Sequence, residues 1–343
     1  MREITQDGQS MKKYMAYGIG AALVDTEIKV DDRELTSMQV EKGLMTLVDR
    51  ERQLELLDHL EGHLVKANHA SGGSAGNSMI ATAQLGGPTF MSCKVANDVD
   101  GDIYIADLEA AGVDHGFTTS RAEGTTGKCL VLITPDAERS MNTFLGISES
   151  LSTEQVDADA IANSEFVYIE GYLVTSATGC AAAVRTREIA EDAGTKTALS
   201  FSDPGMVEFF REGIAAIIGD KVDLIFCNEA EALGWARSDS LEVAIERIKD
   251  VANSFVITRG AAGALTYDGH DMAEIPPHRV HAVDSNGAGD MFAGAFLYAI
   301  TRGEDFPTAG RFASLAAGKV VANYGPRLTA EAYPALRAEF FGD

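Results

Sequence analysis

Basic residues are scarce in this sequence. Lysine and arginine together number 28 against 52 aspartates and glutamates, which gives a formal net charge of −24 over 343 residues. A nucleic-acid-binding protein needs basic side chains gathered where they face the phosphates, and the sequence has no such cluster, which excludes nucleic acid as a partner. The negative field also repels phosphorylated ligands, so a bound phosphate has to be held by local groups.

Long apolar runs are also missing. No stretch is long and apolar enough to cross a bilayer, and residues 1–10 are polar with mixed charge, so we expect neither a membrane span nor a signal peptide. Met11 would serve as well as Met1 for a start, which leaves open whether residues 1–10 are native. Hydrophobic residues still make up 45% of the chain, which is enough for a sizeable core.

Cysteines are few. They are widely separated, stand among apolar or small residues, and include no Cys-x-x-Cys pair. This pattern predicts buried, reduced thiols in a cytoplasmic protein. The cysteines are Cys93, Cys129, Cys180 and Cys227.

From about Ser164 onward, short apolar β-like runs alternate with amphipathic helical patterns. This alternation is typical of a mostly parallel sheet with helices on both faces. The predicted strands are Phe166–Ile169, Thr197–Phe201, Asp223–Cys227 and Ser254–Thr258, and the predicted helices lie at Cys180–Ala193, Met206–Ile218 and Leu241–Val251. A short antiparallel continuation is predicted at Gly263–Tyr267, Met272–Ile275 and Arg279–Val283, followed by helices that begin at Gly287, Pro307 and Thr329.

The N-terminal third is less regular, with predicted strands that stand outside the βα alternation. Such strands indicate a small β-sheet lid over the carboxyl ends of the main strands, where open α/β sheets bind ligands. We expect one domain of residues 14–343 with a lid built from insertions at approximately 22–48 and 114–147. The predicted strands are Met15–Leu23, Thr26–Val30, Leu130–Thr134 and Ser140–Phe144, the last two forming a hairpin.

The most informative segment is Val283–Phe292, where a β-like run ends and an apolar helical pattern begins just after Gly287. Glycines at a strand-to-helix turn let the backbone approach a ligand, and the first N–H groups of the helix can hold an anion. Asp290 stands in the first helical turn, at the mouth of this anion site. Its carboxylate can simply stabilise the helix N-terminus, or it can take a proton from a hydroxyl while the amides stabilise phosphoryl charge.

The segment Asp284–Asp290 resembles the Asp-Thr-x-Gly-Ala-Gly-Asp signature of the ribokinase-like (PfkB) carbohydrate kinases, with Ser285 where threonine is usual. The resemblance spans nearly the whole chain, from about Tyr14 to Phe340. It implies an α/β fold, a three-layer sandwich of a mostly parallel sheet with helices on both faces and a small β-sheet lid. It also implies an ATP-dependent kinase with Asp290 as catalytic base and an anion hole formed by the amides of Gly287, Ala288 and Gly289.

A second glycine-rich segment, Gly72–Asn77, precedes an apolar helical stretch. On its own it is an ordinary loop and helix start. It also resembles the substrate-binding signature of the same kinases, which implies that Gly72, Gly73 and Asn77 contact the acceptor. Asp25 follows the first predicted strand, either as a solvated edge charge or, by the resemblance, as the group that accepts two sugar hydroxyls.

Asn228 and Glu231 directly follow a predicted strand and match the Asn-x-x-Glu of the family, which implies Mg²⁺ positioned through water and the nucleotide phosphates. A solvated helix start with acids in its first turn is the structural alternative. The segment 258–263 corresponds to a loop beside ATP, or is a plain hairpin turn. The implied ATP-binding residues are Asn228, Thr258, Gly260, Gly263 and Asn286. Some relatives hold a monovalent cation such as K⁺ near the positions of Asp284 and Tyr324–Gly325.

Details of the resemblance favour a nucleoside acceptor. Tyr172 lies where adenosine kinases offer an aromatic face to the purine, and stacking a base is worth about 1–3 kcal/mol; a core tyrosine is the alternative. Arg139, in the predicted hairpin, resembles an arginine that reaches the transferring phosphoryl group, although hairpin arginines are usually just solvated. We expect phosphorylation of the 5′-hydroxyl of adenosine in purine salvage, by a monomer or homodimer. Fructose, ribose or a related sugar is the alternative acceptor.

The segment Gly72–Gly76 also fits Gly-x-Ser-x-Gly, the nucleophile turn of α/β-hydrolases, with Ser74 as nucleophile. A hydrolase needs a buried strand immediately before this turn, whereas Lys66–Ser71 is polar. The hydrolase hypothesis also leaves Asp284–Asp290 unexplained and remains a remote alternative. Gly18–Leu23 hints at a dinucleotide-binding turn, but a strand follows it where a helix is needed.

Overall fold

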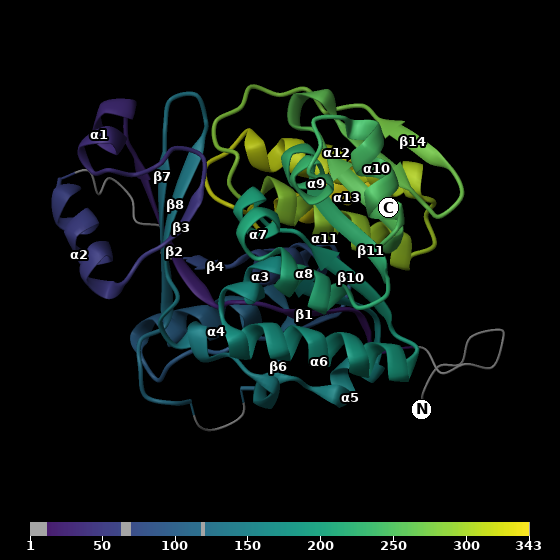
Figure 1. Ribbon diagram of the computed structural model, residues 1–343, viewed down its shortest axis with the longest axis horizontal. Helices are drawn as coiled ribbons and strands as arrows, with labels where there is room; N and C mark the ends of the chain where they lie inside the picture. The colour runs from purple at the N-terminus through teal and green to yellow at the C-terminus, as the bar shows by residue number, and fades with distance from the viewer. Residues whose placement is uncertain (1–11, 63–69, 118–120, 343) are drawn as a thin grey trace.

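Two sheets of unequal size organise the chain (Figure 1). The computed structural model describes residues 12–62, 70–117 and 121–342. The larger sheet has nine strands in the order β14-β13-β12-β11-β10-β9-β1-β5-β6, and the smaller has five in the order β3-β8-β7-β2-β4. The mostly parallel large sheet, the helices around it and the second small sheet confirm the predicted α/β fold class.

The larger sheet is parallel from β6 to β12 and antiparallel from β12 to β14. Its central strands are nearly continuous buried runs because helices cover both faces. The strands predicted between residues 166 and 275 are confirmed to within two residues. The bounds are β1 (Tyr14–Ile19), β5 (Thr89–Ser92), β6 (Val113–His115), β9 (Ser164–Glu170), β10 (Lys196–Ser200), β11 (Val222–Asn228), β12 (Ala252–Thr258), β13 (Ala264–Tyr267) and β14 (Met272–Ile275).

Several predicted elements differ from those in the structure. Arg279–Val283 is not a strand: residues 279–282 are exposed, and the Val283 amide donates to the Val321 carbonyl at the end of α12 (Phe306–Val321). An alternating pattern does not distinguish a strand from an extended connection. Likewise, Met15–Leu23 runs across the break between β1 and β2. The helix Met206–Ile218 divides at Phe210 into α7 (Pro204–Phe209) and α8 (Arg211–Ile218).

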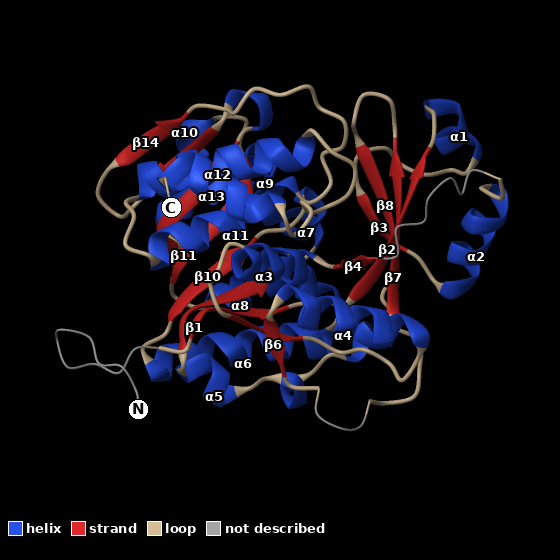
Figure 2. Cartoon of the chain, turned by 180° about the vertical axis from the view of Figure 1, so that it is seen from behind, coloured by secondary structure: helices blue, strands red, loops and turns tan. Residues whose placement is uncertain are grey.

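Helices form a layer on each face of the large sheet (Figures 1 and 2). On one face α11 (Ala288–Thr301) packs between α12 and α3 (Ser74–Gln84), and Phe296 of α11 meets the ring of Phe226 edge-on at 5.7 Å. On the other face α6 (Ala177–Ala193) covers β9 and β10. Among the described helices, none is long and apolar enough to cross a membrane. The remaining helices around this sheet are α4 (Val99–Ala111), α5 (Ala158–Ala162), α9 (Glu229–Ala236), α10 (Leu241–Lys249) and α13 (Ala332–Phe341).

The helices differ in how they begin. Side chains cap α6 and α12, where Ser176 and Asp305 accept backbone N–H groups of the first turn. In contrast, α3 and α11 begin at Gly73 and Gly287, which have no side chain to cap them. These two helices start at the edge of the large sheet that faces the small one, so their first N–H groups are directed at the space between the sheets.

The small sheet stands over the carboxyl ends of the large sheet's strands (Figure 1). Two helices, α1 (Asp32–Ser37) and α2 (Arg50–His59), cover its outer face and bury a separate apolar cluster that includes Leu35, Leu56 and Leu130. Its inner face is not covered by these helices and faces the large sheet. The strands are β2 (Leu23–Lys29), β3 (Met45–Leu47), β4 (Ala70–Gly72), β7 (Gly127–Ile133) and β8 (Arg139–Phe144).

The small sheet is assembled from more of the chain than the insertions 22–48 and 114–147. Both α2 and β4 lie outside these ranges, and β6, which overlaps the start of the second range, pairs with β5 in the large sheet. The hairpin β7–β8 is antiparallel as predicted, whereas β2 and β7 pair in parallel along their whole length. Short strands such as β3 and β4 carry too few residues for an alternating pattern to be recognised.

Close packing of α3 on α11 provides a test of the fold. A Cβ at Gly294 would lie 2.5 Å from the Ser78 carbonyl oxygen and 2.8 Å from the Ala81 Cβ. We therefore expect Gly294→Ala to lower the free energy of unfolding by about 1–3 kcal/mol, measured by chemical denaturation. Gly116→Ala is the control, because its Cβ would approach only Phe90, at 4.0 Å. Equal stability of the two variants would contradict this packing.

Candidate active site

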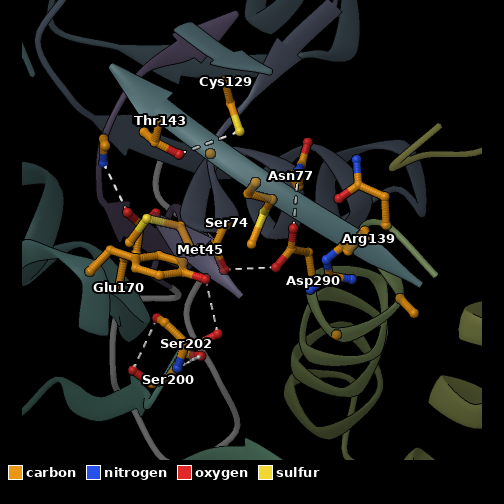
Figure 3. A pocket seen from close by; sticks show the side chains of 18 of the residues that line it. Met45, Ser74, Asn77, Cys129, Arg139, Thr143, Glu170, Ser200, Ser202 and Asp290 are labelled. Carbon is orange, nitrogen blue, oxygen red and sulfur yellow. Dashed lines mark hydrogen bonds between the residues drawn. The ribbon is translucent and has the colours of Figure 1, made fainter. Parts of the chain in front are cut away.

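A cavity of about 490 Å³ lies between the two sheets (Figure 3). Its floor is the carboxyl edge of the large sheet together with the first turns of α3 and α11, and its roof is the inner face of the small sheet. Ligands of open α/β sheets bind at this edge. The cavity therefore has the position expected of a binding site in this fold.

The turn before α11 is tied down by Asp284, which is fully buried. Its Oδ1 accepts the Asn286 amide at 2.8 Å, and its Oδ2 accepts the Gly325 amide at 2.9 Å. Gly287 has a φ of +71°, and a side chain there would overlap the Pro326 carbonyl. Only glycine fits this position, which is what lets α11 begin at the cavity floor with no side-chain cap on its first N–H groups.

Asp290 projects from the first turn of α11 into the cavity (Figure 3). Its Oδ1 accepts the Ser74 hydroxyl at 2.7 Å, and its Oδ2 accepts the Asn77 side-chain amide at 3.0 Å. Removal of the carboxyl from water raises its pKa, and both hydrogen bonds together with the charge of Arg139 oppose that rise. A carboxylate that is held in place and partly desolvated at the uncapped start of a helix can accept a proton.

The start of α3 is fixed by Glu170, the last residue of β9. Glu170 is buried, and its carboxylate accepts the Ala21 amide at 3.2 Å and the Ala75 amide at 2.8 Å. Burial raises its pKa to about 7. Gly73, with a φ of +86°, lies so close to the Ala21 carbonyl that any side chain would overlap it. Glu170 thus links the connection between β1 and β2 to α3, the helix that bears Ser74 and Asn77.

Asp25, on β2, faces the cavity from the small sheet. It is buried, and desolvation, followed by the nearby Glu27, raises its pKa to about 8; Arg327 and Arg139 act in the opposite direction. A Cβ at Gly72 would overlap the Asp25 carboxylate, so glycine at this position leaves room for that group. Gly72 itself packs against the Asp25 carboxylate and does not line the cavity.

Asn228 and Glu231 form a reciprocal cap at the start of α9, on the opposite side of the cavity. Asn228 donates its amide and its side-chain N–H₂ to the Glu231 carboxylate at 3.0 and 2.6 Å, and burial raises the pKa of Glu231 to about 7. No cluster of three metal-ligating His, Cys, Asp or Glu side chains occurs within the described ranges. One carboxylate fits Mg²⁺ only where water and phosphate oxygens complete the shell, which is the usual arrangement for this ion.

Three hydrogen bonds join the small sheet to the turn before α11. Arg139 Nη1 on β8 donates to the Ser285 carbonyl at 2.6 Å, and the Ser285 hydroxyl donates to the Ala137 carbonyl at 3.0 Å. The Asn286 side-chain amide donates to Glu27 on β2 at 3.1 Å. The position of the small sheet is therefore linked to the residues that immediately precede the helix N-terminus.

The inner face of the small sheet makes the roof largely apolar. Tyr172, in the 3₁₀ helix η3 (Gly171–Thr175), lies below it, and its hydroxyl donates to the Ser202 carbonyl at 3.2 Å. Ser202 has a φ of +71°, an uncommon backbone conformation for a residue other than glycine. The roof and wall residues beside Tyr172 are Leu23, Met45, Leu47, Met141, Leu145 and Phe226.

The structure brings most of the predicted site residues to this one cavity. Gly263 is an exception: it lies in the turn before β13, packed on the Ile275 carbonyl, and together with Gly72 it is outside the lining. The lining includes Asp25, Gly73, Asn77, Arg139, Tyr172, Asn228, Glu231, Thr258, Gly260, Asn286, Gly287, Ala288, Gly289 and Asp290. No histidine lines the cavity among the residues described, so a Ser–His pair for a hydrolase with Ser74 is not assembled there.

Sequence reasoning missed Glu170, Glu27 and the bond from Ser74 to Asp290. An acid at the end of the buried run that forms β9 was a usable signal for Glu170, because a carboxylate there has to find partners. The other two contacts join residues more than 200 positions apart, and nothing local in the sequence marks them. The cysteines are free, as expected, and three of them are buried, with Cys180 partly exposed.

Comparison with known proteins identifies the family. The model of the pfkB family carbohydrate kinases matches residues 43–332. The chain belongs to this family. It is similar to the structure of a probable sugar kinase protein from Rhizobium etli CFN 42, which is 34% identical with a TM-score of 0.90 and covers 97% of this chain and 99% of its own. As a pfkB kinase it transfers phosphate from ATP to a hydroxyl group.

Two further relatives of this pfkB kinase bear on its acceptor. The adenosine kinase of Sinorhizobium meliloti is 33% identical with a TM-score of 0.89, over 95% of this chain and 99% of its own. The adenosine kinase of Schizophyllum commune is 28% identical over 326 residues, which cover 86% of this chain and 91% of the relative. The relatives thus include both adenosine and sugar kinases.

The raised pKa of Asp25 provides a test on the pfkB kinase. Between its ordinary value of 3.8 and about 8, the folded chain keeps a proton on Asp25 that the unfolded chain releases, so stability is lost as pH rises through this range. We expect the melting temperature to fall less between about pH 5 and about pH 8 in Asp25→Asn than in the wild type. Asp239→Asn, at an exposed position, should keep the wild-type slope. Identical slopes in all three proteins would contradict the assignment.

Proposed function

We propose that this kinase transfers the γ-phosphoryl group of ATP to the 5′-hydroxyl of a nucleoside, adenosine. The observation that supports this most strongly is the placement of Asp290 beside the uncapped N-terminus of α11, at the floor of a cavity with a largely apolar roof. Its relatives include adenosine kinases that align with nearly the whole chain.

In this proposal Asp290 accepts the proton of the attacking hydroxyl, and the amides of Gly287, Ala288 and Gly289 stabilise the charge on the transferring phosphoryl group. Arg139, which already bonds to the Ser285 carbonyl beside these amides, adds a positive charge. In a strongly acidic protein these local groups have to overcome the repulsion of the whole chain for a phosphate.

The sugar of the acceptor would lie between Asp290 and the residues Gly73, Asp25 and Asn77. Gly73 leaves the backbone open there, and Asp25 and Asn77 offer oxygen and amide groups to hydroxyls. The Asn77 Oδ1 atom is buried and has no hydrogen-bond partner, so it is available to accept a hydroxyl. Asp25, whose raised pKa lets it carry a proton near neutrality, can both donate to and accept from a diol.

The nucleotide would lie toward β11 and β12, along Asn228, Thr258, Gly260 and Asn286. Glu231 and Asn228 would hold Mg²⁺ through water, and the ion would supply charge neutralisation at the β- and γ-phosphates. Gly263 would support this region as a turn residue outside the contact surface. The monovalent cation near Asp284 stays a prediction. Both oxygens of that carboxylate already accept backbone amides.

The roof favours a purine over a bare sugar. Leu23, Met45 and Leu47 offer an apolar surface in the same lining as the ring of Tyr172, and a flat base would pack against such a surface. We also propose that residues 14–343 act as one kinase domain with the small sheet as its lid. A sugar kinase remains the second candidate because the probable sugar kinase of Rhizobium etli aligns as well as the adenosine kinases do.

Loss of the proposed base should remove turnover while the fold remains. General-base catalysis contributes typically about 10²–10⁴-fold, so we expect Asp290→Asn to lose at least ~100-fold in kcat in a coupled ADP-release assay. Asp239→Asn, an exposed carboxylate, serves as the control and should keep full activity. A loss below about tenfold with an unchanged pH profile would exclude Asp290 as the base.

Acceptor choice should depend on the ring of Tyr172. We expect a higher kcat/KM for adenosine than for ribose or fructose, because only the base distinguishes adenosine from ribose at this site. Tyr172→Ala should reduce the adenosine preference by roughly 5- to 150-fold, the equivalent of one lost stack of about 1–3 kcal/mol. Tyr172→Phe keeps the ring, loses the bond to Ser202, and should retain most of the preference. A wild type that prefers ribose or fructose would refute the nucleoside assignment and leave the kinase family intact.

A further inference from the structure

Both oxygens of the Asp290 carboxylate are held by side chains from the first turn of α3. The Ser74 hydroxyl donates to Oδ1 at 2.7 Å, and the Asn77 amide donates to Oδ2 at 3.0 Å (Figure 3). The Asn77 Oδ1 has no hydrogen-bond partner and can still accept a bond from a substrate hydroxyl. Ser74 has a single hydroxyl proton, and the hydroxyl donates it in the hydrogen bond to Asp290.

We infer that Ser74 is a positioning residue for Asp290, whose hydroxyl fixes the carboxylate in one orientation and keeps it ionised for proton transfer. This inference rests on the proposed role of Asp290 as the base. A hydrogen bond donated to a charged carboxylate stabilises the charged form, and such bonds are stronger than bonds between neutral groups.

An ordinary role at a helix start does not account for Ser74. The residue that precedes α3 is Gly73, and the Ser74 side chain accepts no N–H from the first turn. Its hydroxyl instead crosses to α11, a helix more than 200 residues later in the chain. A serine at this position would be equally compatible with the helix if its hydroxyl faced solvent, so the bond to Asp290 is the feature that needs explaining.

The backbone around Ser74 is built to hold it still. Glu170 accepts the amide of the next residue, Ala75, at 2.8 Å and also the amide of Ala21. Ser78, one turn further along α3, donates its hydroxyl to the Ser74 carbonyl at 3.0 Å. The Ser74 side chain therefore starts from a fixed backbone, and its bond to Asp290 requires little additional ordering.

The surroundings of Asp290 make this bond important for its charge. Burial disfavours ionisation of Asp290, while the hydrogen bonds from Ser74 and Asn77 and the charge of Arg139 favour it. Removing the Ser74 hydroxyl should thus raise the pKa of Asp290. The titratable or charged groups that face Asp290 are Asp25 on β2, Arg139 on β8, Tyr168 and Glu170 on β9, and Tyr172 in η3.

The test is the pH dependence of kcat/KM for adenosine in Ser74→Ala, Ser74→Thr and Thr186→Val. In Ser74→Ala we expect the acidic limb to move up by about one pH unit, which is about a tenfold loss of rate on that limb and a smaller loss at high pH. Ser74→Thr retains a hydroxyl and should restore the wild-type limb. Thr186→Val removes a buried hydroxyl on α6 that has no hydrogen-bond partner and does not line the cavity, so its profile should match the wild type.

Each outcome decides a different point. An unshifted acidic limb in Ser74→Ala, or a limb that Ser74→Thr does not restore, overturns the positioning role even where Asp290→Asn is inactive. Full turnover in Asp290→Asn would instead overturn the proposed base. Where Ser74→Ala does not fold by circular dichroism, Ser74→Cys replaces it, because a thiol of similar size is a weak donor. An acidic limb in Ser74→Cys that equals the wild type would likewise overturn the inference.

Discussion

The turn at residues 284–287 is the constraint on which the rest of the site depends. Asp284 is buried, and each of its carboxylate oxygens accepts a hydrogen bond from a backbone amide, one within the turn and one from the loop at Gly325. Gly287 then passes so close to Pro326 that no side chain fits. These contacts close the turn through backbone amides, so α11 needs no side-chain cap, and its N-terminus reaches the cavity without one.

The small sheet depends on the same turn. Arg139, Ala137 and Glu27 all bond to Ser285 or Asn286, the two residues between Asp284 and Gly287. A shift of the small sheet would therefore strain or break the hydrogen bonds to Ser285 and Asn286, the residues that lead into α11. This arrangement links the roof of the cavity to the proposed anion site on its floor.

Buried acids are the other common thread. Asp25, Glu170 and Glu231 have raised pKa values because the cavity withdraws them from water, and each has a defined place: on the roof, beneath α3, and at the cap of α9. Grouping them lowers stability as pH rises, because each must ionise where water is excluded. A site that binds polar ligands has to keep such groups, which is a common reason for active sites to be less stable than they could be.

The sequence by itself determined the αβ alternation, the glycine-rich start of α11 and the family, since these are written in local patterns of apolar residues, glycine and aspartate. It also pointed to most of the residues that line the cavity. Only the tertiary structure decided that Gly72 and Gly263 support the site from outside, that Arg279–Val283 is not a strand, and that Ser74 bonds to Asp290. Local patterns reflect backbone preferences, whereas these contacts join residues distant in the chain, whose meeting is fixed only when the helices pack on the sheet.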